Sequence, residues 1–207
     1  MSLVKLNNNA VKNVTAFGSL TSGSMTFIKK LTASSSSTLS FVDGTSSVVL
    51  DNTYKEYLFT FNNIHPSAEN PNFAFNLSVD SGSNYNVTKT STAFFAQHGE
   101  SGTGGELNYS TARDLSQGTG IQHLTNEAGN DNDQGVSGYL HLFNPSSTTF
   151  VKHYISSTNS NFKYSEPYAY GHYIAGYGNT TSAVDAVQFS FSSGNIDSGD
   201  IVLYGIN

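Results

Sequence analysis

The stretch Asn72-Phe-Ala-Phe-Asn-Leu-Ser-Val-Asp80 carries a large apolar side chain at every second position. Phe73, Phe75, Leu77 and Val79 alternate there with small or polar residues. Because successive side chains of a β-strand point to opposite faces, this alternation predicts a strand with one buried face.

Two other segments, Tyr54–Ile64 and Ala186–Ser192, repeat the pattern. The side chains predicted to be buried are Tyr57, Phe59 and Phe61 in the first segment and Val187, Phe189 and Phe191 in the second. Further strands are predicted at 24–32, 38–42, 91–97, 136–143, 149–156, 168–175 and 200–206. The last of these is apolar on both faces, which predicts a central or covered position in a sheet.

Turn-forming clusters such as Asp43-Gly44, Asn144-Pro145 and Ser193-Gly194 separate the predicted strands. No segment of adequate length shows a helical apolar stripe. The pattern predicts an all-β fold, an antiparallel two-sheet sandwich that resembles a jelly roll. We expect a single domain over residues 24–207, preceded by an N-terminal arm at 1–23.

The composition excludes several classes of protein. Charged residues make up 12% of the chain and aromatic residues 13%, whereas disordered chains are rich in charge and poor in aromatics. There is no cysteine, and the net charge of −6 comes with only one adjacent basic pair, Lys29–Lys30. We therefore expect no disulfides and no nucleic-acid partner. Without a signal sequence or a membrane-spanning apolar run, we expect synthesis in a host cytoplasm and no membrane insertion.

Residues 99–135 interrupt the alternation with many Gly, Asn, Ser and acidic residues. The sequence predicts a long loop excursion here, with a short helix at 121–128 as one option. Asp131-Asn-Asp133-Gln-Gly135 partly resembles a calcium-binding loop, but Leu142 stands where an EF-hand has its bidentate Glu. Two interpretations of this segment are open, a solvated acidic turn and a looser calcium site.

No local motif indicates catalysis. The chain lacks a Gly-x-Ser-x-Gly elbow, a phosphate-binding Gly-x-x-x-x-Gly-Lys loop and a His-Glu-x-x-His pair. The acidic residues Glu100, Glu106 and Asp114 lie in its least regular part, and a metal at His141 and His153 has no evident further ligand. We therefore expect a non-enzymatic protein without a cofactor or metal.

The aromatic stretch Tyr164-Ser-Glu-Pro-Tyr168-Ala-Tyr170-Gly-His172-Tyr173 contains the candidate binding residues. A strand over this stretch places Tyr168, Tyr170 and His172 on one face. Two interpretations are open for these three residues and for Tyr164 and Tyr173. One is core or subunit packing, and the other is a platform on which a sugar or receptor stacks.

Three stretches resemble a group of virion structural proteins from tailed phages of marine bacteria, including cyanophages and pelagiphages. They are Tyr54–Pro66 continuing into Phe75–Tyr85, Gly138–His153, and Asn179–Ile206. The most specific part is the closing pattern Phe-Ser-Ser-Gly-Asn-Ile-x-Ser-Gly-x-Ile-x-Leu-Tyr-Gly-Ile, and the resemblance extends from about residue 24 to the C-terminus.

This resemblance implies a component of the phage particle and supplies no catalytic residues. We expect a capsid decoration or knob protein, or a short appendage component, located in the virion with other virion proteins as partners. It is expected to act by subunit packing as a homo-oligomer, with a trimer as the expected state. The alternative is a tail-fibre or receptor-binding module for host surface glycans.

Overall fold

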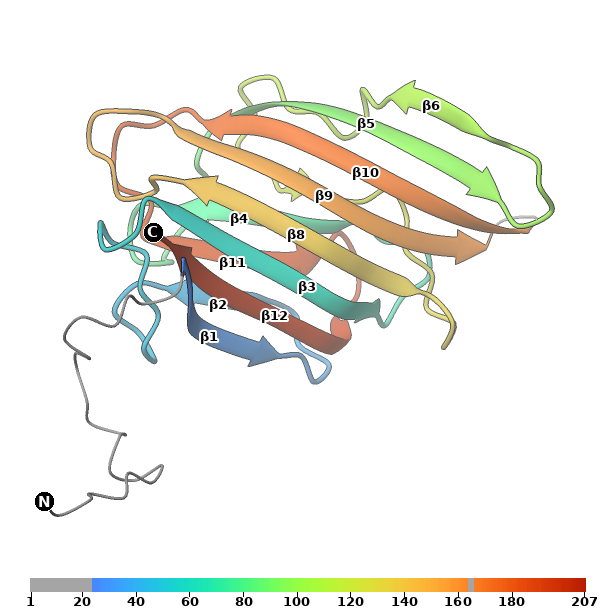
Figure 1. Cartoon of the computed structure of the whole chain (residues 1–207), viewed down its shortest axis with the longest axis horizontal. Coiled ribbons are helices and arrows are strands. Elements are labelled where there is room, and N and C mark those ends of the chain that lie inside the picture. The colour runs from blue at the N-terminus through green and yellow to red at the C-terminus, as the bar shows by residue number, and fades with distance from the viewer. Residues whose placement is uncertain (1–23, 164–165) are drawn as a thin grey trace, which may run out of the picture.

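The computed structural model describes residues 24–163 and 166–207, and the expected N-terminal arm lies outside this part. The strands form two antiparallel sheets that pack face to face (Figure 1). The larger sheet contains, in spatial order, β1 (Met25–Thr32), β12 (Ile196–Ile206), β3 (Glu56–Pro66), β8 (Gly135–Phe143), β9 (Lys152–Lys163), β10 (Pro167–Gly178), β5 (Lys89–Gly99) and β6 (Glu106–Tyr109). The smaller contains β2 (Leu39–Val42), β11 (Ala186–Phe191), β4 (Phe73–Ser78) and β7 (Gln122–His123).

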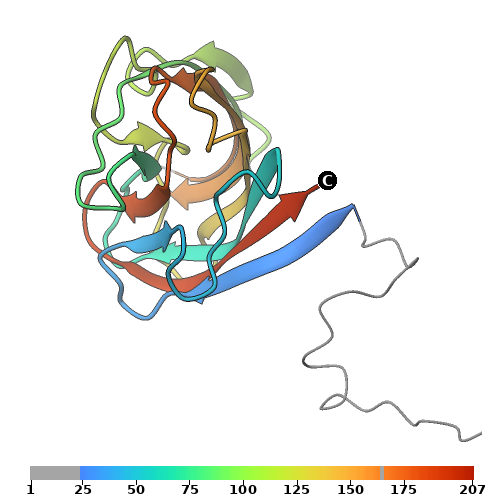
Figure 2. The same ribbon diagram turned by 90° about the vertical axis from the view of Figure 1, so that its left-hand side faces the viewer.

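The order of the strands confirms the predicted jelly-roll-like sandwich. Without β5, β6, β9 and β10, the sheets have the orders β1-β12-β3-β8 and β2-β11-β4-β7. Consecutive strands of this set then cross from one sheet to the other, except between β4 and β7, as in a jelly roll. The pairs β5–β6 and β9–β10 extend the larger sheet beyond β8, so that this sheet curves around the smaller one (Figure 2).

Aromatic side chains from both sheets meet in the core. Phe189 of β11 lies 5.3 Å from Phe59 and 5.2 Å from Phe61 of β3, measured between ring centroids. Phe41 and Phe73 contact the same group, and all five rings are buried. The predicted buried faces of Tyr54–Ile64 and Ala186–Ser192 are therefore confirmed.

The structure differs from the predicted one-sided burial of β4. Phe73, Phe75 and Leu77 are buried as expected, but Asn76 and Ser78 on the opposite face are buried as well. The amide of Asn76 donates hydrogen bonds to the backbone carbonyls of Tyr85 and Thr119, because the segments that contain them cover this face.

The predicted excursion at 99–135 is mostly loop, and short strands within it also join it to both sheets. This region supplies β6 to the larger sheet and β7 to the smaller, and β7 lies where a short helix was considered. Leu124 and Ala128 are fully buried, since the segment after β7 packs into the core. The sequence did not predict these contacts, because the region is rich in polar residues. Strands of two or four residues also carry too few apolar positions for a periodic signal.

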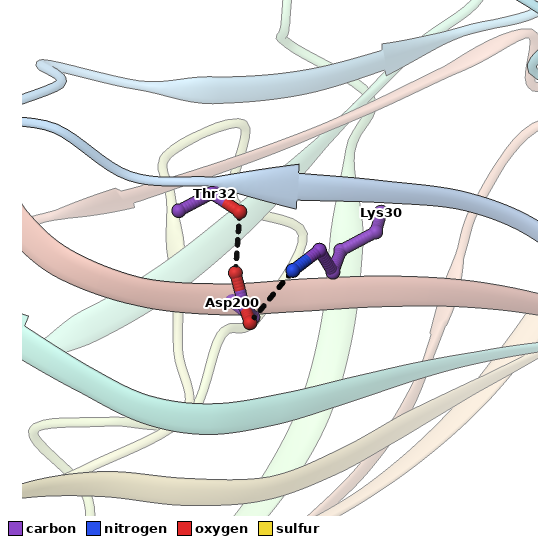
Figure 3. Close-up of polar contacts among 3 residues, drawn as sticks. All are labelled: Lys30, Thr32 and Asp200. Carbon is purple, nitrogen blue, oxygen red and sulfur yellow. Dashed lines mark hydrogen bonds and ion pairs between the residues drawn. The ribbon is translucent and has the colours of Figure 1, made fainter.

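The C-terminal strand β12 is central, as predicted from its apolar faces, and lies between β1 and β3. Asp200 links it to the edge strand β1 (Figure 3) by accepting hydrogen bonds from the Thr32 hydroxyl and from the Lys30 ammonium at 3.1 Å. The Thr32 hydroxyl, and then Lys30, hold the pKa of the Asp200 carboxyl below its usual range. Such exposed pairs contribute about 0–1 kcal/mol, so they set the register of β1 more than they stabilise it.

A glycine at a bulge of β12 provides the first test of the fold. Gly199 has φ +112°, and a Cβ there would overlap the Asn63 carbonyl and the Ile64 Cα of the neighbouring strand. We expect Gly199→Ala to lower the free energy of unfolding by about 2 kcal/mol, measured by urea denaturation. Gly120→Ala, where a Cβ meets open space, is the control and should change stability little; equal effects would contradict this packing.

Candidate functional site

The predicted aromatic stretch lies on β10, which divides its side chains between the two faces of the larger sheet. Tyr168, Tyr170 and His172 share the inner face, as predicted, and Tyr173 points outward. Tyr164 lies outside the described residues. Tyr170 is 6% exposed and His172 3%, so neither ring offers an open face to a sugar. Their burial fits the packing interpretation.

The inner side chains form an aromatic stack with Phe162 of β9. The Tyr170 and His172 rings are nearly parallel, 5.6 Å apart, and Phe162 lies 5.5 Å from Tyr170. The His172 Nε2 accepts the backbone N–H of Asn126 at 3.3 Å and lies 3.0 Å from the Ser160 Oγ. Burial, followed by the charge of Arg113, lowers the pKa of His172 to about 3. This histidine is a neutral structural group.

The outer face of the same sheet is rich in exposed apolar side chains. Tyr173 stacks on Phe94 of β5 with ring centroids 5.1 Å apart, and Phe94 pairs in turn with Tyr109 of β6. The large apolar residues that are at least 40% exposed on this face are Met25, Phe27, Phe94, Leu107, Tyr109, Tyr139, Ile155 and Tyr173. We call this set the outer apolar face.

Strand register shows that these residues lie in rows across the whole sheet. One row runs through Lys30, Val202, Thr60, Tyr139, Ser157, Tyr173, Phe94 and Tyr109. A second runs through Phe27, Tyr204, Leu58, His141, Ile155, Ala175 and Thr92. Because directly paired residues of antiparallel strands point to the same side, the rows form one surface with a single lysine.

This face includes a groove of about 500 Å³ over β8, β9, β10 and β5. Small residues, Ala175 and Gly176, leave room between the larger side chains of Phe143, His153 and Tyr177. His141 and His153 both lie on this side of the sheet, and His141 Nδ1 is 3.9 Å from a Glu56 carboxylate oxygen. Among the described residues, no three His, Asp or Glu side chains gather as metal ligands would.

A second cleft, also of about 500 Å³, is polar and opens where β3, β8, β9 and β12 meet the loop before β8. Its lining residues are Asn63, His65, Asn132, Asp133, Gln134, Gly135, Val136, Ser137, Asn159, Asn161, Asp197 and Ser198. We call it the polar cleft. It contains the acidic segment that was considered for calcium.

Comparison of the chain with protein-family models, curated proteins and solved structures gives no match. Within the described part of the chain, no helix is long and apolar enough to cross a membrane. The roles of the outer apolar face and of the polar cleft are therefore inferred from their geometry alone.

Of the outer apolar face, only Tyr173 was among the candidate residues predicted from the sequence. One signal was present in Ala93-Phe-Phe-Ala96, where adjacent aromatics place one ring on each side of a strand. Phe95 is indeed near the inner stack, 5.6 Å from Tyr170, whereas Phe94 is 43% exposed. The polar cleft had no local signal, because its residues come from four separate strands and a loop.

Proposed function

We propose that the protein is a non-enzymatic structural component of a phage particle, a capsid decoration or knob protein or a short appendage component. Its resemblance to virion proteins of marine tailed phages indicates the kind of particle. The observation that carries the proposal is the outer apolar face, which remains exposed although the core between the sheets is filled.

The size of this face favours a second copy of the chain as its partner. Eight large apolar side chains that are roughly half exposed present about 100 Å² each, or roughly 800 Å² in total. That is about the area each partner contributes to an interface of standard size. The low charge of the rows also matches the core of a protein interface.

Packing of identical copies suits a particle component, because symmetric contacts repeat and add their affinities. A homo-oligomer, with a trimer as the expected state, presents the same surface many times without any need for a reactive site. A density map of the phage particle would test the placement, and a chain absent from every particle would contradict it.

We expect the double variant Phe94→Glu, Tyr139→Glu to dissociate the oligomer. Each substitution places a carboxylate on the outer apolar face, where an interface would desolvate it at a cost of several kcal/mol. Sedimentation velocity should show an oligomer for the wild-type chain and a monomer for the variant. The matched control is Phe150→Glu, because Phe150 is also exposed, at 67%, but lies in the turn before β9.

Two results would contradict self-association through this face. One is a wild-type chain that sediments as a monomer at every concentration; the other is equal dissociation by Phe150→Glu. Circular dichroism of each variant shows whether the fold is kept, so loss of structure is not read as loss of the interface.

The second candidate function is a receptor-binding module for host surface glycans. Tyr170 and His172 do not favour it, since they are buried. The polar cleft does favour it, because its lining consists almost entirely of hydrogen-bonding side chains.

A further inference from the structure

Two β-bulges shape the polar cleft. The register of β3 on β8 shifts between Phe61 and Ile64, and the register of β12 on β3 shifts on both sides of Ser198. Asn63, in the first bulge, has a left-handed backbone with φ +49°. Bulges turn side chains away from the regular ladder, and here they direct polar residues toward the space between the strand ends and the loop.

Hydrogen bonds to the sheet hold the loop that closes the cleft. The side-chain amide of Asn161 donates to the Asp133 carbonyl at 2.8 Å and accepts the Gly135 N–H at 2.9 Å. His65 Nε2 donates to the Asp131 carbonyl at 3.1 Å. These bonds hold the loop against β3 and β9 and so pre-organise the cleft.

Several polar groups of the lining keep hydrogen-bonding capacity that the fold does not use. Asn63 and Asp133 contact their neighbours through backbone atoms, the N–H of Asn63 and the carbonyl of Asp133. Asn159 uses its amide nitrogen on the Tyr170 carbonyl, which leaves its Oδ1. Asp197 uses Oδ1 to accept the Ser35 hydroxyl, which leaves its Oδ2. The cleft thus offers carboxylate and amide acceptors beside amide donors.

The charges and the polarity of the lining side chains exclude several classes of ligand from the polar cleft. It contains no lysine or arginine, and Asp133 and Asp197 repel anions, which excludes phosphate, sulfate and acidic sugars. Val136 is its one large apolar residue, which excludes a lipid or an apolar peptide. The side chains do not form a cluster of metal ligands in the described part of the chain.

We infer that the polar cleft binds a neutral carbohydrate. Hydroxyl groups of a sugar donate to carboxylates and accept from amides, so a neutral polyol satisfies both kinds of group at once. The volume lies within the range of small-molecule sites, about 300–1,000 Å³. This site differs from the predicted aromatic strand and does not depend on self-association through the outer apolar face.

Saturation-transfer difference NMR on the full chain tests the inference with a panel of glucose, galactose, mannose, N-acetylglucosamine and short neutral oligomers of each. At least one of them should give a signal. Asp133→Ala should weaken its binding about tenfold or more, because a hydrogen bond to a charged group is lost. Asn108→Ala, an exposed asparagine on β6, is the matched control and should bind as the wild type does.

Three outcomes would overturn the inference. The first is no signal from any neutral sugar of the panel, and the second is stronger binding of glucose 6-phosphate than of glucose. The third is binding that Phe94→Glu, Tyr139→Glu abolishes while Asp133→Ala leaves it intact, which places the sugar on the outer apolar face. Binding by the monomeric double variant supports the cleft, even if the proposed packing function fails.

Discussion

Lowering the pH from 7 to 4.5 is expected to remove about 5 kcal/mol from the free energy of unfolding. The cause is the burial of two histidines in neutral form. Burial, and then the charge of Arg113, lowers the pKa of His172 to about 3 and that of His123 to about 4. Both residues return to a pKa near 6.5 when the chain unfolds.

The sign follows from proton uptake. Below pH 6.5 the unfolded chain binds protons at both histidines and the folded chain does not, so stability falls as the pH falls. The loss continues until the pH passes the folded values near 4 and 3. Since typical domains are stable by about 5–15 kcal/mol, thermal unfolding at pH 4.5 should occur far below its temperature at pH 7.

His172→Gln isolates one of the two groups. Glutamine keeps an acceptor for the Asn126 N–H, removes the titrating ring and should remove about half of the pH dependence between 7 and 4.5. His153→Gln is the control, because His153 is exposed on the outer face of the sheet. A pH dependence of unfolding temperature that His172→Gln leaves unchanged would contradict the role of burial.

Removing the Phe189 ring from the core should lower the free energy of unfolding by a similar amount. Phe189 is fully buried and contacts the rings of Phe59, Phe61 and Phe73, which belong to both sheets. We expect Phe189→Ala to lower the free energy of unfolding by about 3–5 kcal/mol, because it removes buried apolar surface and leaves a cavity. Urea denaturation at pH 7 measures the change.

If Phe189→Ala does not fold, Phe189→Leu is the milder substitution to measure. It should lower the free energy of unfolding by less, about 1–2 kcal/mol. Phe150→Ala is the matched control, since that ring is 67% exposed, and should change stability by less than about 0.5 kcal/mol. A loss below about 1 kcal/mol for Phe189→Ala would mean that this ring does not join the two sheets.

Local pattern was enough to predict the sandwich and most of its core. Tyr57, Phe59 and Phe61 face the core because residues two apart in a strand share a face, whatever the rest of the chain does. The central place of β12 followed in the same way, since a strand apolar on both faces needs neighbours or cover.

The functional surfaces depend on segments that are far apart in the chain. Whether Tyr173 becomes part of an apolar face depends on β10 lying between β9 and β5, and no residue near Tyr173 encodes that order. The burial of His172 likewise depends on the segment around Asn126, which hydrogen-bonds to its ring. Of the two interpretations left open for His172, core packing thus depends on a contact that the local sequence does not contain.

The positions of the strands and of their apolar faces could be predicted locally, because they depend on residues two apart in the chain. Strand pairing, the cover over each second face and the positions of the register shifts emerged only in the folded molecule. The polar cleft shows the difference, since Asn63, Asp133 and Asn159 come together only when bulged strands and a loop meet. Strand pairing depends on contacts between distant segments, whereas the periodicity of one strand tells which face is buried and not which strand lies beside it.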